Sequence, residues 1–217
     1  VAGSYRAIDF ALSNMSNSHI QRVAVLTQYN ARSLNEHLSS SKWWDFGRKQ
    51  GGLYIFTPTI TAANSSWYRG TADAIYQNLA WLKKSHEPYV VNASGDAVYK
   101  MDYNKVLEYH IDKKADITVV CKDMPAGTDV SRFGVLRTDE DGRILDFEEK
   151  PVETSGSTIS CGIYVIRRRQ LIELIEKCAQ EDRYDFVRDI LIRYKNLKRI
   201  FAYRITDYWN SISSVES

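Results

Sequence analysis

The sequence predicts an α/β fold with a mixed, mainly parallel central sheet. Strand-like and helix-like segments alternate along the first 130 residues. The strand-like segments are continuously apolar, as is typical of parallel strands that are covered by helices on both faces. After residue 130 the alternation gives way to a strand-like hairpin, which adds antiparallel strands to the sheet.

The strands are predicted from runs of apolar and β-branched residues that end at turn residues. Within 132–151, the pair Asp141-Gly142 is a strong signal for a tight turn between two strands. The predicted strands are 20–28, 52–58, 87–94, 115–123, the two arms of 132–151, 157–168 and 199–205. We expect 20–28, 88–94 and 115–122 to lie side by side.

The helices are predicted from apolar residues that recur three or four positions apart. In 70–84 this spacing places one apolar face along the helix, and Thr71 is its candidate N-cap, with Asp73 in the first turn. The remaining predicted helices are 4–18, 31–38, 102–114, 169–180 and 185–195.

Composition excludes several classes of protein. The net charge of +2 does not support nucleic-acid binding, and no apolar run approaches the roughly 20 residues of a membrane helix. The three cysteines are odd in number and show no CxxC spacing, which favours a reducing, cytoplasmic setting. The four histidines are scattered, so a zinc site has little support.

Asp96 is the first candidate functional residue. It follows the apolar run Tyr89-Val90-Val91 and a turn of small residues, and a helical pattern begins near Asp102. Ligands of open α/β sheets bind at the carboxyl ends of the strands, where a carboxylate can hold Mg²⁺ beside nucleotide phosphates. The alternative is a turn aspartate that caps the next helix, and position alone favours that alternative.

Eight motifs in one order along the chain change this balance. They are YRAIDFALSN (5–14), VLTQYN (25–30), WYRGTADAIYQN (67–78), GDAVYKMDY (95–103), RFGVL (132–136), FEEKP (147–151), SCGIYV (160–165) and DYWNSIS (207–213). Together they resemble bacterial glucose-1-phosphate adenylyltransferases, the ADP-glucose pyrophosphorylases of glycogen synthesis. The resemblance implies a Rossmann-like nucleotidyltransferase fold that makes ADP-glucose and pyrophosphate from ATP and glucose 1-phosphate, with Mg²⁺.

On the nucleotide side, the resemblance implies roles for two residues. Gly70 would let the backbone approach the adenine, where a Cβ would intrude. A glycine at a helix start is the equally supported alternative. Tyr68 would lie near the sugar nucleotide, and its alternative is a core tyrosine.

On the sugar side, the resemblance implies that Gly134 offers backbone to the sugar and that Glu149 accepts hydrogen bonds from glucose hydroxyls. Lys150 would meet the sugar phosphate as a point charge and act, with Asp96, in catalysis. Ser160 would add a sugar contact from a neighbouring strand. We expect the four sugar-side residues to converge on one pocket. Without the resemblance, Glu149 and Lys150 would be an ordinary charged strand end, which is the more common case.

The sequence departs from the family at the metal site. Such enzymes hold Mg²⁺ with two aspartates, and Asp96 matches the first. At the second position this chain has Ser211, and Ala97 replaces the histidine that follows the first. A serine hydroxyl holds Mg²⁺ far less strongly than a carboxylate does, so we expect Mg²⁺ to be weakly held. We expect Ser211 to face Asp96 across the cleft.

Two hypotheses from different classes follow. One is a regulatory, weakly or non-catalytic subunit that binds ATP and glucose 1-phosphate or ADP-glucose in a homo- or hetero-oligomer with a catalytic paralogue. The other is an active adenylyltransferase; an enzyme for another sugar phosphate is a weaker third. We favour the regulatory subunit. We also expect residues 1–217 to be a fragment that lacks the first strand, the glycine-rich loop and the C-terminal β-helix domain of the family.

Overall fold

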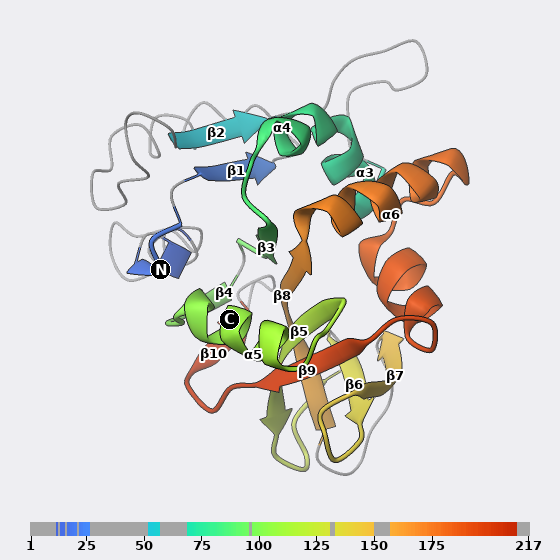
Figure 1. Cartoon of the computed structure of the whole chain (residues 1–217). Helices are drawn as coiled ribbons and strands as arrows, with labels where there is room; N and C mark the ends of the chain where they lie inside the picture. The colour runs from blue at the N-terminus through green and yellow to red at the C-terminus, as the bar shows by residue number, and fades with distance from the viewer. Residues whose placement is uncertain are drawn as a thin grey trace.

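The computed structural model describes residues 12, 14–15, 17–20, 22–26, 52–56, 69–95, 97–130, 133–149 and 157–211. For 52–56, Val98, Glu149 and Ser211 it describes the backbone only. Helices pack on a central sheet, and this arrangement confirms the predicted α/β class (Figure 1).

The longest strand of the central sheet, β8 (Ser157–Arg167), lies at its centre. One edge of β8 pairs with β5 (Ile117–Met124). The other edge pairs with β3 (Tyr89–Ala93) at one end and with β6 (Gly134–Thr138) at the other. The sheet is completed by β9 (Ile200–Arg204) beside β5 and by β7 (Ile144–Glu149) beside β6.

The strand directions confirm a mixed sheet. Strands β3, β5, β6 and β9 point one way, and β7 and β8 point the other. The prediction that 88–94 and 115–122 are neighbours is wrong, because β8 lies between them. A central strand is covered on both faces, and β8, of 11 residues, is buried along most of its length and apolar from Cys161 to Ile166.

The strand predicted at 20–28 is β1 (Arg22–Leu26), and among the described residues it pairs only with β2 (Gly52–Phe56), in parallel. The prediction that 20–28 and 88–94 lie side by side is therefore not met within the described residues, because β1 does not pair with β3 there. The predicted hairpin is confirmed as β6 and β7, and Gly142 in its turn has a φ of 90°, which a glycine adopts without strain.

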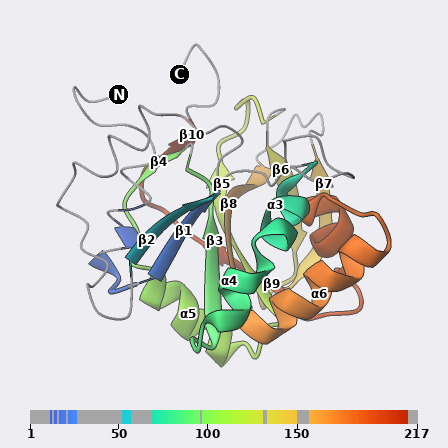
Figure 2. The same ribbon diagram turned by 90° about the horizontal axis from the view of Figure 1, so that it is seen from above.

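Two hydrophobic cores cover the two faces of the sheet. Side chains of β5 alternate between them: Val119 lies in one core and Val120 in the other. The first core contains α3 (Thr71–Gln77), α4 (Leu79–Lys84), α6 (Arg168–Gln180) and the π-helix η1 (Val187–Ile192). The second contains α5 (Tyr103–Asp112), which Figure 2 shows on the opposite side of the sheet from α3, α4 and α6.

The helix predicted at 70–84 divides at Asn78, whose side-chain amide donates to the carbonyl of Ala74 at 2.9 Å. The N-cap of α3 is Gly70, so the assignment of that role to Thr71 was wrong. The Thr71 hydroxyl instead accepts a hydrogen bond from the backbone N–H of Phe186 at 3.0 Å. The Thr71 hydroxyl, which the local pattern predicted to cap the helix, is thus used in a tertiary contact.

Two short strands were absent from the predicted ranges, although the second was expected from the register of Tyr208-Trp209. They are β4 (Ala97–Tyr99) and β10 (Trp209–Ser211), which pair in antiparallel fashion and bury Tyr99 and Trp209 in the second core. No helix in the described part of the chain is long and apolar enough to cross a membrane.

Candidate active site

The carboxyl end of β3 leads through Ser94 and Gly95 to position 96. The N–H of Ser94 donates to the carbonyl of Gly162 in β8 at 3.1 Å, which ties this turn to the centre of the sheet. Asp96 itself lies outside the described residues, between Gly95 and Ala97, which are described. A residue here lies at the edge of the sheet where α/β proteins bind their ligands.

The capping role considered for Asp96 belongs to another residue. Helix α5 has Asp102 as its N-cap, and its carboxylate accepts the N–H of Asn104 at 3.0 Å. Strand β4 also separates position 96 from that helix. The helix that motivated the capping alternative therefore does not need Asp96.

The backbone register brings Ala97 and Ser211 together. Ser211 lies opposite Ala97 in the pair of β4 and β10. Directly opposite residues of antiparallel strands have Cα atoms about 4.5–5.5 Å apart, and Ala97 follows Asp96 directly. The side chains of Asp96 and Ser211 are outside the described part, so the expectation that they face one another stays a prediction.

On the sugar side, strand pairing brings together the backbone at 134, 149 and 160. Gly134 lies opposite Glu149, and Val135, the next residue, lies opposite Ile159 in β8. Ser160 is 8% exposed, and its hydroxyl accepts the N–H of Gly162 at 3.2 Å. The side chain of Glu149 and all of Lys150 are outside the described residues, so the predicted pocket of four remains a prediction.

A bulge in β8 connects this group to the carboxyl end of β3. Val119 of β5 pairs with Tyr164, but Cys121 pairs with Ser160, so β8 has extra residues around Gly162. Gly162 has a φ of 70°, which other residues rarely adopt. The bulge aims the Gly162 carbonyl at Ser94, and Ser160 thereby lies close to the turn that contains Asp96.

One cavity of about 1520 Å³ joins the start of α3, the turn after β3 and the bulge of β8, whereas Gly134 and Ser160 do not line it. Its lining includes Thr71 at the start of α3, the Ser94-Gly95 turn, and Gly162 and Tyr164 of β8. The same cavity continues between β1 and β3, where residues of both strands line it. The predicted nucleotide side, which starts at α3, and the predicted metal side, which starts at β3, therefore open on a common space.

Gly70 is constrained by packing. A Cβ at this position would lie 2.3 Å from the carbonyl oxygen of Tyr184, too close for any other residue without displacement of the backbone. The alternative of a helix-start glycine is thus supported by its place as the N-cap of α3. Thr71, the next residue, lines the cavity. Tyr68 lies outside the described residues.

Gly134 has a similar packing constraint, because a Cβ there would lie 2.5 Å from the ring of Phe147. The sequence reading missed two aromatic residues that line or border the cavity, Tyr164 and Phe186, whose ring centroids are 5.1 Å apart. Tyr164 falls within the motif SCGIYV and could have been found there. Phe186 carries no local signal, since its pattern is that of an ordinary apolar helix position.

The electrostatics of the described residues nearby exclude a thiolate nucleophile. Burial raises the pKa of Cys121 to about 12 and raises the pKa of Cys161 further still. Burial also raises the pKa of Tyr99, on β4, to about 12. Within the described part, no three His, Cys, Asp or Glu side chains form a group that could hold a metal ion.

Comparison with known proteins places the chain in a family. A family model described as "Nucleotidyl transferase" matches residues 1–217. The chain is 42% identical over 223 residues to a glucose-1-phosphate adenylyltransferase of Thermotoga maritima, covering 99% of this chain and 52% of that protein. It is 41% identical over 218 residues to the enzyme of the same name from Clostridium acetobutylicum, covering 99% of this chain and 57% of that protein.

A third such relative, from Lachnospira eligens, is 42% identical over 216 residues, covering 99% of this chain and 51% of that protein. The chain thus spans about half the length of the curated relatives it matches. The match of the family model over the whole chain agrees with the α/β architecture and with the cavity at the carboxyl end of β3. The chain belongs to the nucleotidyl transferase family.

Proposed function

We propose that this chain is part of a glucose-1-phosphate adenylyltransferase-type protein that acts as a regulatory, weakly or non-catalytic subunit. Its ligands are ATP and glucose 1-phosphate, or ADP-glucose, and it forms a homo- or hetero-oligomer with a catalytic paralogue. The single observation that carries this proposal is the pairing of β4 with β10, in which the backbone of Ser211 lies opposite Ala97, the residue that follows Asp96 in the sequence.

The residue roles are part of the proposal. Asp96 would hold Mg²⁺, and Lys150 would meet the phosphate of the sugar. Gly134, Glu149 and Ser160 would contact the sugar, and the pairing of β6 with β7 and β8 supports their common location. On the nucleotide side, Tyr68 and Gly70 would flank the adenine and its sugar, since Thr71 beside them lines the cavity.

The donor set at the metal position fits Mg²⁺ poorly. A carboxylate at position 96 and a hydroxyl at position 211 supply one negative charge where two carboxylates would supply two. Mg²⁺ bound there would neutralise phosphate charge in the transfer of the adenylyl group, and weak retention of the ion removes that help.

Two further parts of the proposal concern the setting of the chain. All three cysteines are buried and unbridged, which supports a reducing, cytoplasmic compartment. The cavity between β1 and β3 supports the expectation of a further strand: both strands line it, and within the described residues neither pairs with a strand on that side. An apolar strand from outside residues 1–217 would join β1 to β3.

The second candidate function is a fully active adenylyltransferase. It is favoured by the 42% identity to relatives that are named as such enzymes. Under this alternative, Asp96 would hold Mg²⁺ without a second carboxylate at position 211, and catalysis would proceed at ordinary Mg²⁺ concentrations.

The substitution Ser211→Asp separates the two candidates. We expect the full-length wild-type protein to show little activity alone and to need high Mg²⁺. Ser211→Asp should raise activity by about 10-fold or more and lower the Mg²⁺ requirement, because a carboxylate is restored next to Asp96. The measurement is ADP-glucose formation as Mg²⁺ is varied, with and without the catalytic paralogue.

Asn210→Asp is the matched control, since it adds the same charge one residue away, on the opposite face of β10. It should leave both activity and Mg²⁺ requirement as in the wild type. Robust wild-type turnover at ordinary Mg²⁺ that Ser211→Asp does not change would overturn the regulatory-subunit proposal in favour of the active enzyme.

A further inference from the structure

We infer that Arg69 and Tyr184 form a pair of positioning residues that sets the nucleotide side of the cleft. Neither residue is needed as a ligand contact for this role. The inference rests on the proposed function, because it takes the start of α3, at Gly70 and Thr71, as the nucleotide side. It goes beyond that function by assigning the control of this side to a segment far away in the sequence, residues 182–186.

Four contacts join the start of α3 to Tyr184 and Phe186. The N–H of Ala72 donates to the carbonyl of Tyr184 at 2.9 Å, and the N–H of Phe186 donates to the hydroxyl of Thr71 at 3.0 Å. The guanidinium of Arg69 donates to the Tyr184 hydroxyl at 2.8 Å and lies 4.1 Å from the centroid of its ring. The backbone and side chain of Tyr184 thus hold both sides of the N-cap residue, Gly70.

The two segments pack closely at Gly70. A Cβ added there would lie 2.3 Å from the Tyr184 carbonyl oxygen, so only a glycine allows the two backbones to be this near. Any shift of Tyr184 toward α3 must therefore move Gly70 as well. Thr71, attached to Gly70, would carry that shift to the wall of the cavity.

Arg69 is itself fixed from the helix side by a buried carboxylate. Asp73 has a side chain that is only 1% exposed, and it accepts the backbone N–H of Arg69 at 2.8 Å and its Nε at 3.4 Å. The hydrogen bond that the Arg69 guanidinium donates to Asp73 is the main reason why the pKa of Arg69 is raised. A guanidinium held this way is a rigid platform for the Tyr184 ring, because it has few other orientations.

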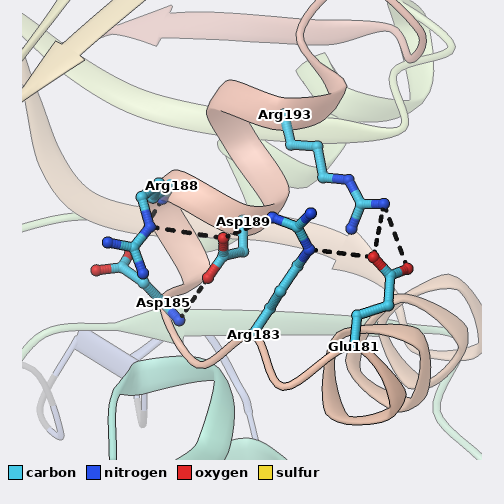
Figure 3. A network of polar contacts seen from close by, with 6 residues as sticks. All are labelled: Glu181, Arg183, Asp185, Arg188, Asp189 and Arg193. Carbon is cyan, nitrogen blue, oxygen red and sulfur yellow. Dashed lines mark hydrogen bonds and ion pairs between the residues drawn. The ribbon is translucent and has the colours of Figure 1, made fainter.

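The other side of the Tyr184 segment is anchored by the network in Figure 3. The Asp189 carboxylate accepts the N–H of Asp185 at 3.0 Å and lies 3.4 Å from Arg183 and 3.5 Å from Arg188. Arg183 also pairs with Glu181 at 3.1 Å. The segment therefore connects η1 to α3, and its position is set from both ends.

The experiment compares the affinities of two ligands in variants of the full-length protein. Tyr184→Phe removes the hydroxyl that Arg69 contacts, and Arg69→Leu removes the guanidinium. Each should weaken ATP binding about 3- to 10-fold, because Tyr184→Phe removes the hydrogen bond from Arg69, and Arg69→Leu removes that bond together with the cation–π contact. Binding of glucose 1-phosphate should stay within about 2-fold of the wild type, because the sugar side lies on β6, β7 and β8. Isothermal titration with ATP alone and with glucose 1-phosphate alone measures both.

Tyr109→Phe is the control, because it removes a hydroxyl that donates one hydrogen bond, to the carbonyl of Ala202 at 2.7 Å, whereas the Tyr184 hydroxyl accepts from Arg69 at 2.8 Å and donates to Asp182 at 3.0 Å. Tyr109 does not line the cavity. Tyr109→Phe should leave both affinities unchanged. The double variant Arg69→Leu, Tyr184→Phe should bind ATP no more weakly than Arg69→Leu alone, since both changes break one pair.

The outcomes are distinguishable. Wild-type ATP affinity in Tyr184→Phe and Arg69→Leu overturns the inference and leaves the proposed function intact. Equal weakening of both ligands by Tyr184→Phe, or the same loss in Tyr109→Phe, shows a general loss of structure and also overturns it. A wild-type protein that binds no ATP overturns the proposed function, and the inference with it.

Discussion

His110 is a buried histidine without a role in the proposed site. It is 2% exposed, and its Nδ1 lies 2.7 Å from the hydroxyl of Thr118, while its ring meets the edge of Tyr89 at 5.7 Å. Burial, together with the positive charge of Arg167, lowers the pKa of His110 from 6.5 to about 4. The folded protein therefore keeps this imidazole neutral at pH values where the unfolded chain protonates it.

This difference predicts a loss of stability in mild acid. Between about pH 6.5 and pH 4 the unfolded chain binds a proton at His110 that the folded state refuses, so the free energy of unfolding should fall by about 3 kcal/mol. Urea unfolding at a series of pH values measures it. His110→Gln should flatten the slope in this range, whereas His86→Gln, at an exposed site, should not. A slope that His110→Gln leaves unchanged would contradict the assignment.

At the scale of elements, the turn between α6 and η1 is held by charge rather than by apolar burial. The side chain of Asp189 is 4% exposed. Burial by itself would raise its pKa, but the N–H of Asp185 and the guanidinium of Arg188 lower it, and the net pKa is below its ordinary value. Asp189 lies within the π-helix η1 and accepts the N–H of Asp185 in the turn, so its carboxylate connects the turn to the helix.

Removing this carboxylate should cost more than removing an exposed one. Asp189→Ala leaves the Asp185 N–H and the Arg188 guanidinium without this acceptor and removes one of the two carboxylates that Arg183 contacts. We expect a loss of about 2–4 kcal/mol in the free energy of unfolding. Asp146→Ala is the control: it breaks the 2.9 Å pair with Lys195, but that carboxylate is 36% exposed, so the loss should be below about 1 kcal/mol. Denaturant unfolding of both variants decides; equal losses would refute the claim.

Elements with a strong periodic or turn signal were predictable. The hairpin at 134–149 was marked by Asp141-Gly142, and α6 by its apolar spacing. The break at Asn78 was not, because it depends on one side-chain hydrogen bond to Ala74. The short strands β4 and β10 carry three residues each, too few for a period, and exist because each pairs with the other.

The candidate site divides in the same way. The placement of position 96 at the end of β3 was predictable, because a buried strand followed by small residues has a distinct pattern. The contribution of Tyr184 was not, because it reaches Gly70 only through the tertiary packing of two remote segments. The position of Ser211 came from the family motif, and the pairing with Ala97 then gave it a place in the fold.

At the scale of the whole molecule, the sheet has a firm centre and one open side. Strands β5 and β8 have partners on both edges, and they pass between the two cores. Strands β1 and β3 line the large cavity instead. Paired edges and buried apolar side chains protect a backbone from solvent, so resistance to opening should vary across the sheet.

Hydrogen exchange of the 217-residue chain should report this variation. We expect the amides of β5 and β8 to exchange slowest and those of β1 and β3 to exchange faster, because opening at the cavity breaks fewer contacts. A longer chain that supplies the proposed strand should protect β1 and β3 and leave β5 unchanged. Uniform protection in the 217-residue chain would argue that the cavity is closed by other means.

The central place of β8 also constrains the order of folding during synthesis. Val90 of β3 pairs with Ile166 of β8, and Thr118 of β5 pairs with Val165 of β8. Neither β3 nor β5 can form these pairs until β8 has been synthesised. Until β8 leaves the ribosome, β3 and β5 are apolar segments with free edges. Such late, long-range pairing slows folding and exposes nascent chains to aggregation. The central strand β8 is thus made after β3 and β5, and its late synthesis extends the time during which both remain unpaired and prone to aggregate.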